Sequence, residues 1–166
     1  MRRSAALTLL VTLLLAPLAS AETWQTFQPE GGGFSVSFPG PATHHQQTVE
    51  GLVMHNYVAT SGGYGYSVSY TQFPAEAIPA GEERALMRTY LESVAGQVKA
   101  SKVDTTEVTL QQHKGIEYLM SSGQVEARGR LFLVKGRLFD LMAAGKAGSL
   151  GGGPVEKFLA SFTLVP

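Results

Sequence analysis

Residues 125–144 have the sequence VEARGRLFLVKGRLFDLMAA, and this stretch is the strongest indication of the fold. It predicts two strands, 125–135 and 137–144, joined by the short turn Lys135-Gly136. Within these strands the runs 131–134 and 138–142 are nearly continuous in apolar character, which is typical of strands that are covered on both faces. We therefore expect an antiparallel hairpin inside a sheet, with further layers packed above and below it.

Other strand-like runs surround this hairpin in the sequence. Alternating or strand-favouring residues predict strands over 34–38, 52–60, 64–70, 102–111 and 116–121. Short connections that contain glycine link the predicted strands between 102 and 144, so we expect an antiparallel meander there. Ser61-Gly62-Gly63 makes a hairpin of the runs 52–60 and 64–70. The tail 163–166 either adds an edge strand or packs as coil.

Two helices are predicted as well. Residues 82–99 place apolar side chains at spacings of four, three and four, at Met87, Leu91, Val94 and Val98. Pro154 opens a shorter helix whose apolar residues also share one face: Val155, Phe158, Leu159 and Phe162. Helices that cover both faces of the sheet would bury these stripes. The sequence thus predicts an α+β fold, an α/β/α layered sandwich around a central antiparallel sheet.

The first 21 residues have the three parts of a secretory signal peptide. Arg2 and Arg3 precede the apolar run 5–18, and Ala19-Ser20-Ala21 supplies a cleavage site with small residues. We expect cleavage after Ala21 and a single domain over 22–166, either secreted or periplasmic. The chain contains no cysteine, so a lipid anchor at the new N-terminus is excluded. No later apolar run approaches the ~18 residues that span a bilayer, so the domain should not be embedded in a membrane.

The charge balance argues against nucleic acid as a partner. The chain has 13 lysines and arginines against 13 acidic residues, and cleavage would remove Arg2 and Arg3. The mature domain then has no basic excess with which to neutralise phosphates.

Several short motifs resemble a known family. Aromatic residues near the expected mature start, Trp24 and Phe27, are followed by GFSVSFPGP at 33–41, and RGRLFLVKGRLF at 128–139 and KFLASF at 157–162 come later. In this order the motifs resemble the PsbP-like group of small exported bacterial proteins, which shares its fold with the extrinsic PsbP subunit of photosystem II. The resemblance implies an α/β/α sandwich and a binding, assembly or accessory role without enzyme activity. No metal or docking residue of that group maps onto this chain.

Two groups of residues form a candidate binding surface. Tyr64, Tyr66 and Tyr70 share one face of their strand, and this row belongs to the core if it is covered or binds a ligand or partner if it is exposed. Arg128 and Arg130 share a face with Glu117 on the neighbouring strand. They form either a cross-strand ion-pair ladder or a site for an anion or carboxylate.

Other polar residues give weaker indications of chemistry. His44 and His45 are adjacent and would point to opposite faces of an extended segment, so a metal site would need His55, His113 or Glu50, and a solvated turn is the favoured interpretation. The only aspartates are Asp104 and Asp140, which leaves few ways to assemble a catalytic triad. Asp140 lies inside an apolar strand, where burial would raise its pKa unless it finds a partner.

These observations predict a non-enzymatic binding or accessory protein with no cofactor, no metal and no catalytic residues. Its expected partner is another extracytoplasmic protein or an envelope component. A protein that binds a small ligand, an anion or a metal is the alternative, and an unrecognised hydrolase is a third possibility.

Overall fold

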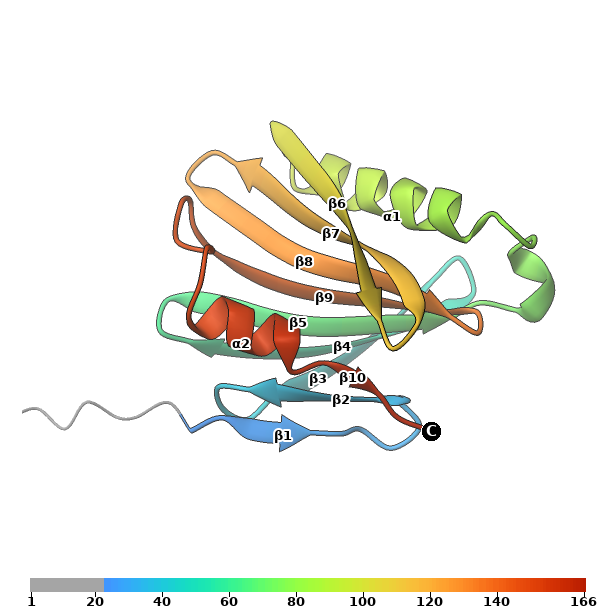
Figure 1. Cartoon of the computed structure of the whole chain (residues 1–166), viewed down its shortest axis with the longest axis horizontal. Coiled ribbons are helices and arrows are strands. Elements are labelled where there is room, and N and C mark those ends of the chain that lie inside the picture. The colour runs from blue at the N-terminus through green and yellow to red at the C-terminus, as the bar shows by residue number, and fades with distance from the viewer. Residues whose placement is uncertain (1–22) are drawn as a thin grey trace, which may run out of the picture.

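The computed structural model describes residues 23–166, so the predicted signal peptide 1–21 lies outside the described residues. Figure 1 shows a large sheet with layers on both of its faces. The strands are β1 (Gln25–Phe27), β2 (Phe34–Phe38), β3 (Thr43–Val49), β4 (Leu52–Ser61), β5 (Tyr64–Gln72), β6 (Lys102–Leu110), β7 (His113–Ser122), β8 (Val125–Val134), β9 (Arg137–Lys146) and β10 (Thr163–Leu164). The helices are α1 (Glu83–Gln97) and α2 (Pro154–Ala160), with a 3₁₀ turn at Ala75–Ala77.

The large sheet has seven strands in the order β3-β4-β5-β9-β8-β7-β6, and every neighbouring pair is antiparallel. The predicted hairpin of residues 125–144 forms β8 and β9, and β9 is the middle strand of the sheet. The predicted meander from β6 to β9 and the hairpin of β4 and β5 are both confirmed.

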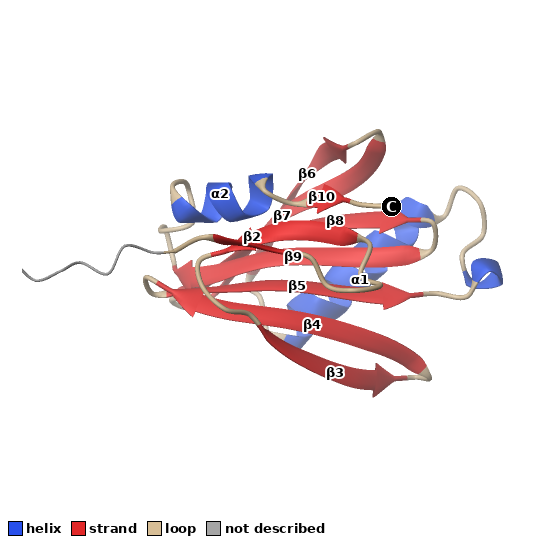
Figure 2. Cartoon of the chain, turned by 90° about the horizontal axis from the view of Figure 1, so that it is seen from below, coloured by secondary structure: helices blue, strands red, loops and turns tan. Residues whose placement is uncertain are grey.

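The two faces of the large sheet carry different layers, as Figure 2 shows from a second direction. Helix α1 covers one face, and its residues Met87 and Leu91 belong to one apolar cluster with Leu131 of β8. A small sheet, β1-β2-β10, covers the other face together with α2. The α+β class and the large antiparallel sheet are confirmed. The predicted sandwich differs from the structure in its second outer layer, where strands lie beside the helix.

Aromatic residues hold the small sheet to the large one. Phe34 in β2 is fully buried, and its ring lies 6.1 Å from the Tyr57 ring, 6.0 Å from the Phe139 ring and 5.5 Å from the Phe162 ring. These partners come from β4, β9 and the segment after α2. The small sheet and the large sheet therefore share one apolar core.

Two strands were not expected from the sequence. Strand β1 has three residues, and β3 is exposed along its whole length, so neither shows the alternation that a half-buried strand requires. The predicted solvated turn at His44 and His45 is wrong in its conformation, because both residues lie in β3, although both are exposed. Backbone pairing with β4 holds this edge strand in place.

Candidate functional site

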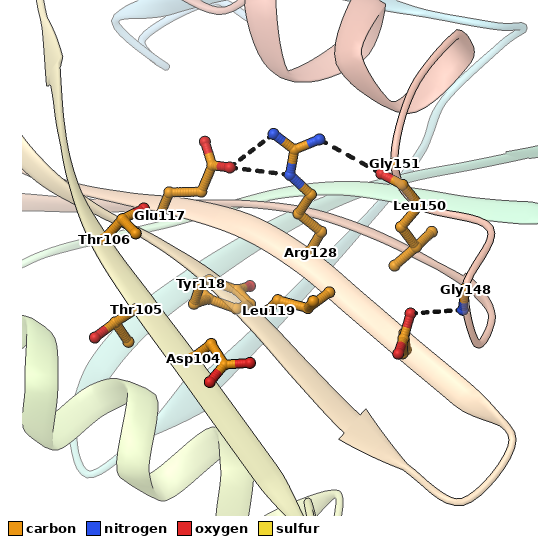
Figure 3. Close-up of a pocket in the computed structure, with 11 residues that line it drawn as sticks. Asp104, Thr105, Thr106, Glu117, Tyr118, Leu119, Arg128, Gly148, Leu150 and Gly151 are labelled. Atoms are coloured by element: carbon orange, nitrogen blue, oxygen red, sulfur yellow. Dashed lines mark hydrogen bonds and ion pairs between the residues drawn. The ribbon is translucent and has the colours of Figure 1, made fainter.

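An open groove of about 620 Å³ lies beside Arg128, one of the residues predicted to form a binding surface, as Figure 3 shows. One wall is formed by β6, β7 and β8, and the other by the loop of residues 147–153 that joins β9 to α2. The lining residues are Asp104, Thr105, Thr106, Glu117, Tyr118, Leu119, Glu126, Arg128, Gly148, Leu150 and Gly151.

Two of the lining residues, Glu117 and Arg128, belong to a cluster of four charged side chains that has Glu117 at its centre. One carboxylate oxygen, Oε1, accepts from Nε and Nη2 of Arg128 at 2.9 and 2.7 Å, and Oε2 accepts from Nε of Arg130 at 2.7 Å. The sheet makes this possible because Glu117 in β7 lies directly opposite Arg130 in β8, and Arg128 lies two residues away on the same face. The predicted ladder is thus present in the structure.

Helix α2 closes the cluster from the other side. Glu156 Oε2 lies 3.0 Å from Arg128 Nη2, and Glu156 Oε1 lies 3.4 Å from Arg130 Nη2. The Leu150 and Leu159 carbonyls accept from Nη1 of Arg128 and Arg130 at 3.4 and 3.2 Å. Two guanidinium groups therefore face two carboxylates, and protein acceptors already occupy donors that an incoming anion would need.

The electrostatics agree with this geometry. Burial alone would raise the pKa of Glu117, but the hydrogen bonds and charges of Arg130 and Arg128 outweigh burial and leave that pKa lowered. For Arg128, burial alone would lower the pKa, but Glu117 and Glu156 leave it raised. Glu117 and Arg128 therefore stay charged around neutral pH.

The tyrosine row predicted on β5 is part of the core. Tyr66 is fully buried and Tyr70 is 8% exposed, because the small sheet and α2 cover this face. The Tyr66 ring lies between those of Trp24 and Phe158. Tyr64 is half-buried and donates to the Ser149 carbonyl at 3.2 Å, at the loop that borders the groove. Of the two outcomes that the sequence left open for this row, core packing is the one observed.

Asp140 is buried on the opposite face of the large sheet, beneath α1. Its Oδ1 accepts from Tyr118 Oη at 2.8 Å, and its Oδ2 accepts from Tyr90 Oη at 3.0 Å. Burial raises the pKa of Asp140 to about 6, and the two hydrogen bonds only partly counteract it. The sequence indicated an acid that needs a partner, but it did not identify Tyr90 and Tyr118.

A second groove, of about 650 Å³, lies at the other end of the same sheet face. Lys135, Arg137 and His113 supply its basic groups, and no Asp or Glu is among the described residues that line it. Arg137 donates to the Gly31 and Gly32 carbonyls and to Gln72 Oε1, so its donors also serve the fold. His113 lines this groove, whereas Asp140 accepts from Tyr90 of α1 on the opposite face of the sheet, so these two residues are not brought together.

Within residues 23–166 there is no group of three or more His, Asp or Glu side chains placed to hold a metal ion. Neither helix of that part of the chain is long and apolar enough to cross a membrane. The side chain of His44 pairs with that of His55 on the neighbouring strand, and no side-chain contact between His44 and His45 is found within residues 23–166.

Comparisons with known proteins give a match at the level of structure. No protein-family model matches the chain, and no curated protein does. The solution structure of cyanobacterial PsbP (CyanoP) from Synechocystis sp. PCC 6803 aligns with a TM-score of 0.56 and 10% identity, covering 92% of this chain and 98% of that chain. The crystal structure of a protein of unknown function from Pseudomonas aeruginosa aligns with a TM-score of 0.36 and 9% identity, covering 76% of this chain and 85% of that chain.

The CyanoP alignment spans nearly all of both chains, and the motifs that resembled PsbP lie in or directly beside β1, β2, β8, β9 and α2. At this level of identity the comparison concerns the fold and leaves the activity to the site itself. The chain has a PsbP-like fold.

Proposed function

We propose that this chain is a non-enzymatic binding or accessory protein, secreted or periplasmic, that associates with another extracytoplasmic protein or an envelope component. The groove between β6, β7, β8 and the 147–153 loop is the surface proposed to receive the partner. The observation that carries the proposal is the construction of this groove, which has an apolar base, carboxylates among its lining residues and a wall joined to α2 by ion pairs.

The base and rim favour a polypeptide segment as the occupant. Leu119 and the buried Leu150 supply the apolar base, and exposed Asp104 and Thr106 stand on the rim. The lining has three carboxylates, from Asp104, Glu117 and Glu126, against the one guanidinium of Arg128. An apolar side chain flanked by lysine or arginine on the partner complements this chemistry.

The charge cluster supports binding over catalysis. Glu117 keeps its carboxylate form because its pKa is lowered, so it is poorly suited to donate a proton. Its hydrogen bonds to Arg128 and Arg130 tie β7 to β8, and the contacts of these two arginines with Glu156 tie β8 to α2. These ion pairs restrict the motion of this wall, and a less mobile wall lowers the entropic cost of association.

Affinity capture from an extract of the source cell envelope tests the proposal. The bait is the exported protein, with Thr106→Arg as the groove variant and Thr48→Arg as the matched control, because both threonines are exposed strand residues and Thr48 lies on β3. We expect one protein to be captured by the wild type and by Thr48→Arg, and to be lost with Thr106→Arg. Equal capture by all three baits would contradict a role for the groove.

Export is tested separately by the intact mass of the protein recovered from its compartment. We expect the mass of residues 22–166, recovered outside the cytoplasm. A cytoplasmic protein that retains residues 1–21 would refute the proposed localisation and leave the groove test unaffected.

A further inference from the structure

His44 and His55 form a pair of imidazoles on the hairpin of β3 and β4, away from the groove. Nε2 of His44 lies 3.1 Å from Nδ1 of His55, and the planes of the two rings differ by 7°. The nitrogens come from two strands whose register is fixed, since His44 lies opposite Tyr57 and Gln46 lies opposite His55.

Two tyrosine rings support this pair from below. The His44 ring stacks on the Tyr57 ring with centroids 4.5 Å apart, and the His55 ring stacks on the Tyr70 ring with centroids 4.7 Å apart. Tyr57 and Tyr70 are 6% and 8% exposed, so the core holds both rings in place. The imidazoles consequently lie on a fixed platform that limits their tilt, although His44 itself is exposed.

We propose that His44 and His55 together bind one divalent transition-metal ion, with Cu²⁺ preferred. A metal–imidazole bond is about 2.0–2.1 Å long, so two nitrogens at neighbouring positions on one ion lie about 2.9–3.4 Å apart. The observed 3.1 Å falls within this range. Copper is preferred because Cu²⁺ binds nitrogen ligands more tightly than the other divalent ions of its row.

The near-parallel orientation of the two rings, whose planes differ by 7° with centroids 5.3 Å apart, is a second feature of the pair. An imidazole lone pair lies in the plane of its ring, so an ion bound by both rings must lie in both planes. Without metal, the two nitrogens share one proton in a hydrogen bond. Binding requires that proton to move to the other nitrogen of its own ring, while both rings turn so that their lone pairs converge on the ion.

The neighbouring residues complete the site and supply its control. Gln46 lies opposite His55 and on the same face of β3 as His44, so its amide oxygen is a candidate third ligand, with water filling the remaining positions. His45 is adjacent to His44 but projects from the other face of the strand. Substitution of His45 therefore tests whether an exposed histidine of β3 contributes to copper binding without belonging to the pair.

The test is a calorimetric titration of the purified protein with Cu²⁺, repeated with Ni²⁺ and Zn²⁺. We expect one Cu²⁺ per chain, bound at least about tenfold more weakly by His44→Gln and by His55→Gln, and within about twofold of wild type by His45→Gln. Electron paramagnetic resonance of the copper complex should show coupling to two imidazole nitrogens. His44→Asn and His55→Asn serve as second variants if a glutamine variant does not fold.

Unchanged Cu²⁺ affinity in both His44 and His55 variants would overturn the proposal, and so would an equal loss in His45→Gln. Tighter binding of Zn²⁺ than of Cu²⁺ would overturn the preference for copper. The proposal is independent of the groove, because none of these residues lines it.

Discussion

Tyr90 in α1 and Asp140 in β9 are joined across the interface between helix and sheet, with Tyr90 Oη donating to Asp140 Oδ2 at 3.0 Å. Tyr118 in β7 donates to the other carboxyl oxygen. Burial raises the pKa of Asp140 from 3.8 to about 6. The folded chain therefore binds this proton more tightly than the unfolded chain does, and this difference makes stability depend on pH.

The Asp140 proton should stabilise the fold under mildly acidic conditions. The contribution is fully present below about pH 4 and is lost as pH rises through about 6, because the buried carboxylate then forms. Asp140→Asn removes this titration and keeps an acceptor for one tyrosine. We expect the free energy of unfolding of the wild type to fall by up to about 3 kcal/mol between pH 4 and pH 7, relative to that of Asp140→Asn.

Urea unfolding of both proteins at pH 4, 5, 6 and 7 measures this difference. Asp140→Leu is the companion variant. Relative to Asp140→Asn it should be destabilised by about 1–3 kcal/mol at every pH, because it leaves the Tyr90 and Tyr118 hydroxyls without their acceptor. Parallel stability curves for the wild type and Asp140→Asn would show that the pKa of Asp140 is not raised.

The half-buried pair of Glu117 and Arg128 should contribute more stability than an exposed pair. Both side chains are about one-fifth exposed, at 18% and 20%, whereas Lys102 and Asp104 are 68% and 55% exposed. A double-mutant cycle with Glu117→Ala and Arg128→Ala should give a coupling free energy above about 1 kcal/mol at neutral pH. The Lys102–Asp104 cycle is the control, and its coupling should lie within error of zero.

The Glu117 coupling should also have its own pH dependence. Because the pKa of Glu117 is lowered in the folded chain, its contribution is present above the ordinary value of 4.5 and is lost as pH falls through the folded pKa. This trend is opposite to that of Asp140. Coupling that stays constant in acid would contradict the assignment of the stabilisation to the Glu117 carboxylate.

Phe34 should be essential to the packing of the small sheet against the large sheet. It is fully buried in β2, and its ring contacts aromatic rings from the large sheet and from the segment after α2. Phe34→Ala removes these contacts and should lower the free energy of unfolding by about 3–5 kcal/mol. Thermal unfolding followed by tryptophan fluorescence and by circular dichroism should give coincident transitions, since Trp24 adjoins the small sheet.

If the fluorescence transition of Phe34→Ala precedes the loss of strand signal, the two sheets have separate cores. A decrease of less than about 1 kcal/mol in the free energy of unfolding of Phe34→Ala would lead to the same conclusion, because the surroundings of Phe34 would then not be closely packed.

The sequence predicted elements whose side chains show a clear periodicity. Residues 34–38 were expected as a strand and form β2, and the expected helix 82–99 forms α1 over Glu83–Gln97. Strand β3 was not predicted because THHQQTV is polar on both faces and its place depends on pairing with β4. The small sheet was also not predicted, because its strands are brought together from the two ends of the domain.

The candidate site was predictable only in part, for a related reason. A hairpin brings Glu117 close to Arg128 and Arg130, so local sequence spacing sufficed to place them together. Glu156 reaches the same cluster from α2, and Tyr90 reaches Asp140 from α1. Contacts of this kind depend on tertiary packing, which leaves no regular spacing in the sequence.

Photo-crosslinking in living cells tests the central claim most directly. A benzophenone amino acid at position 106 stands on the rim of the groove, and the same residue at position 48 on β3 is the control. We predict one adduct of defined mass with an extracytoplasmic protein from position 106, none from position 48, and loss of the adduct when Asp104→Lys is added. Absence of an adduct from position 106, or equal adducts from both positions, would contradict the claim that the groove binds a partner protein.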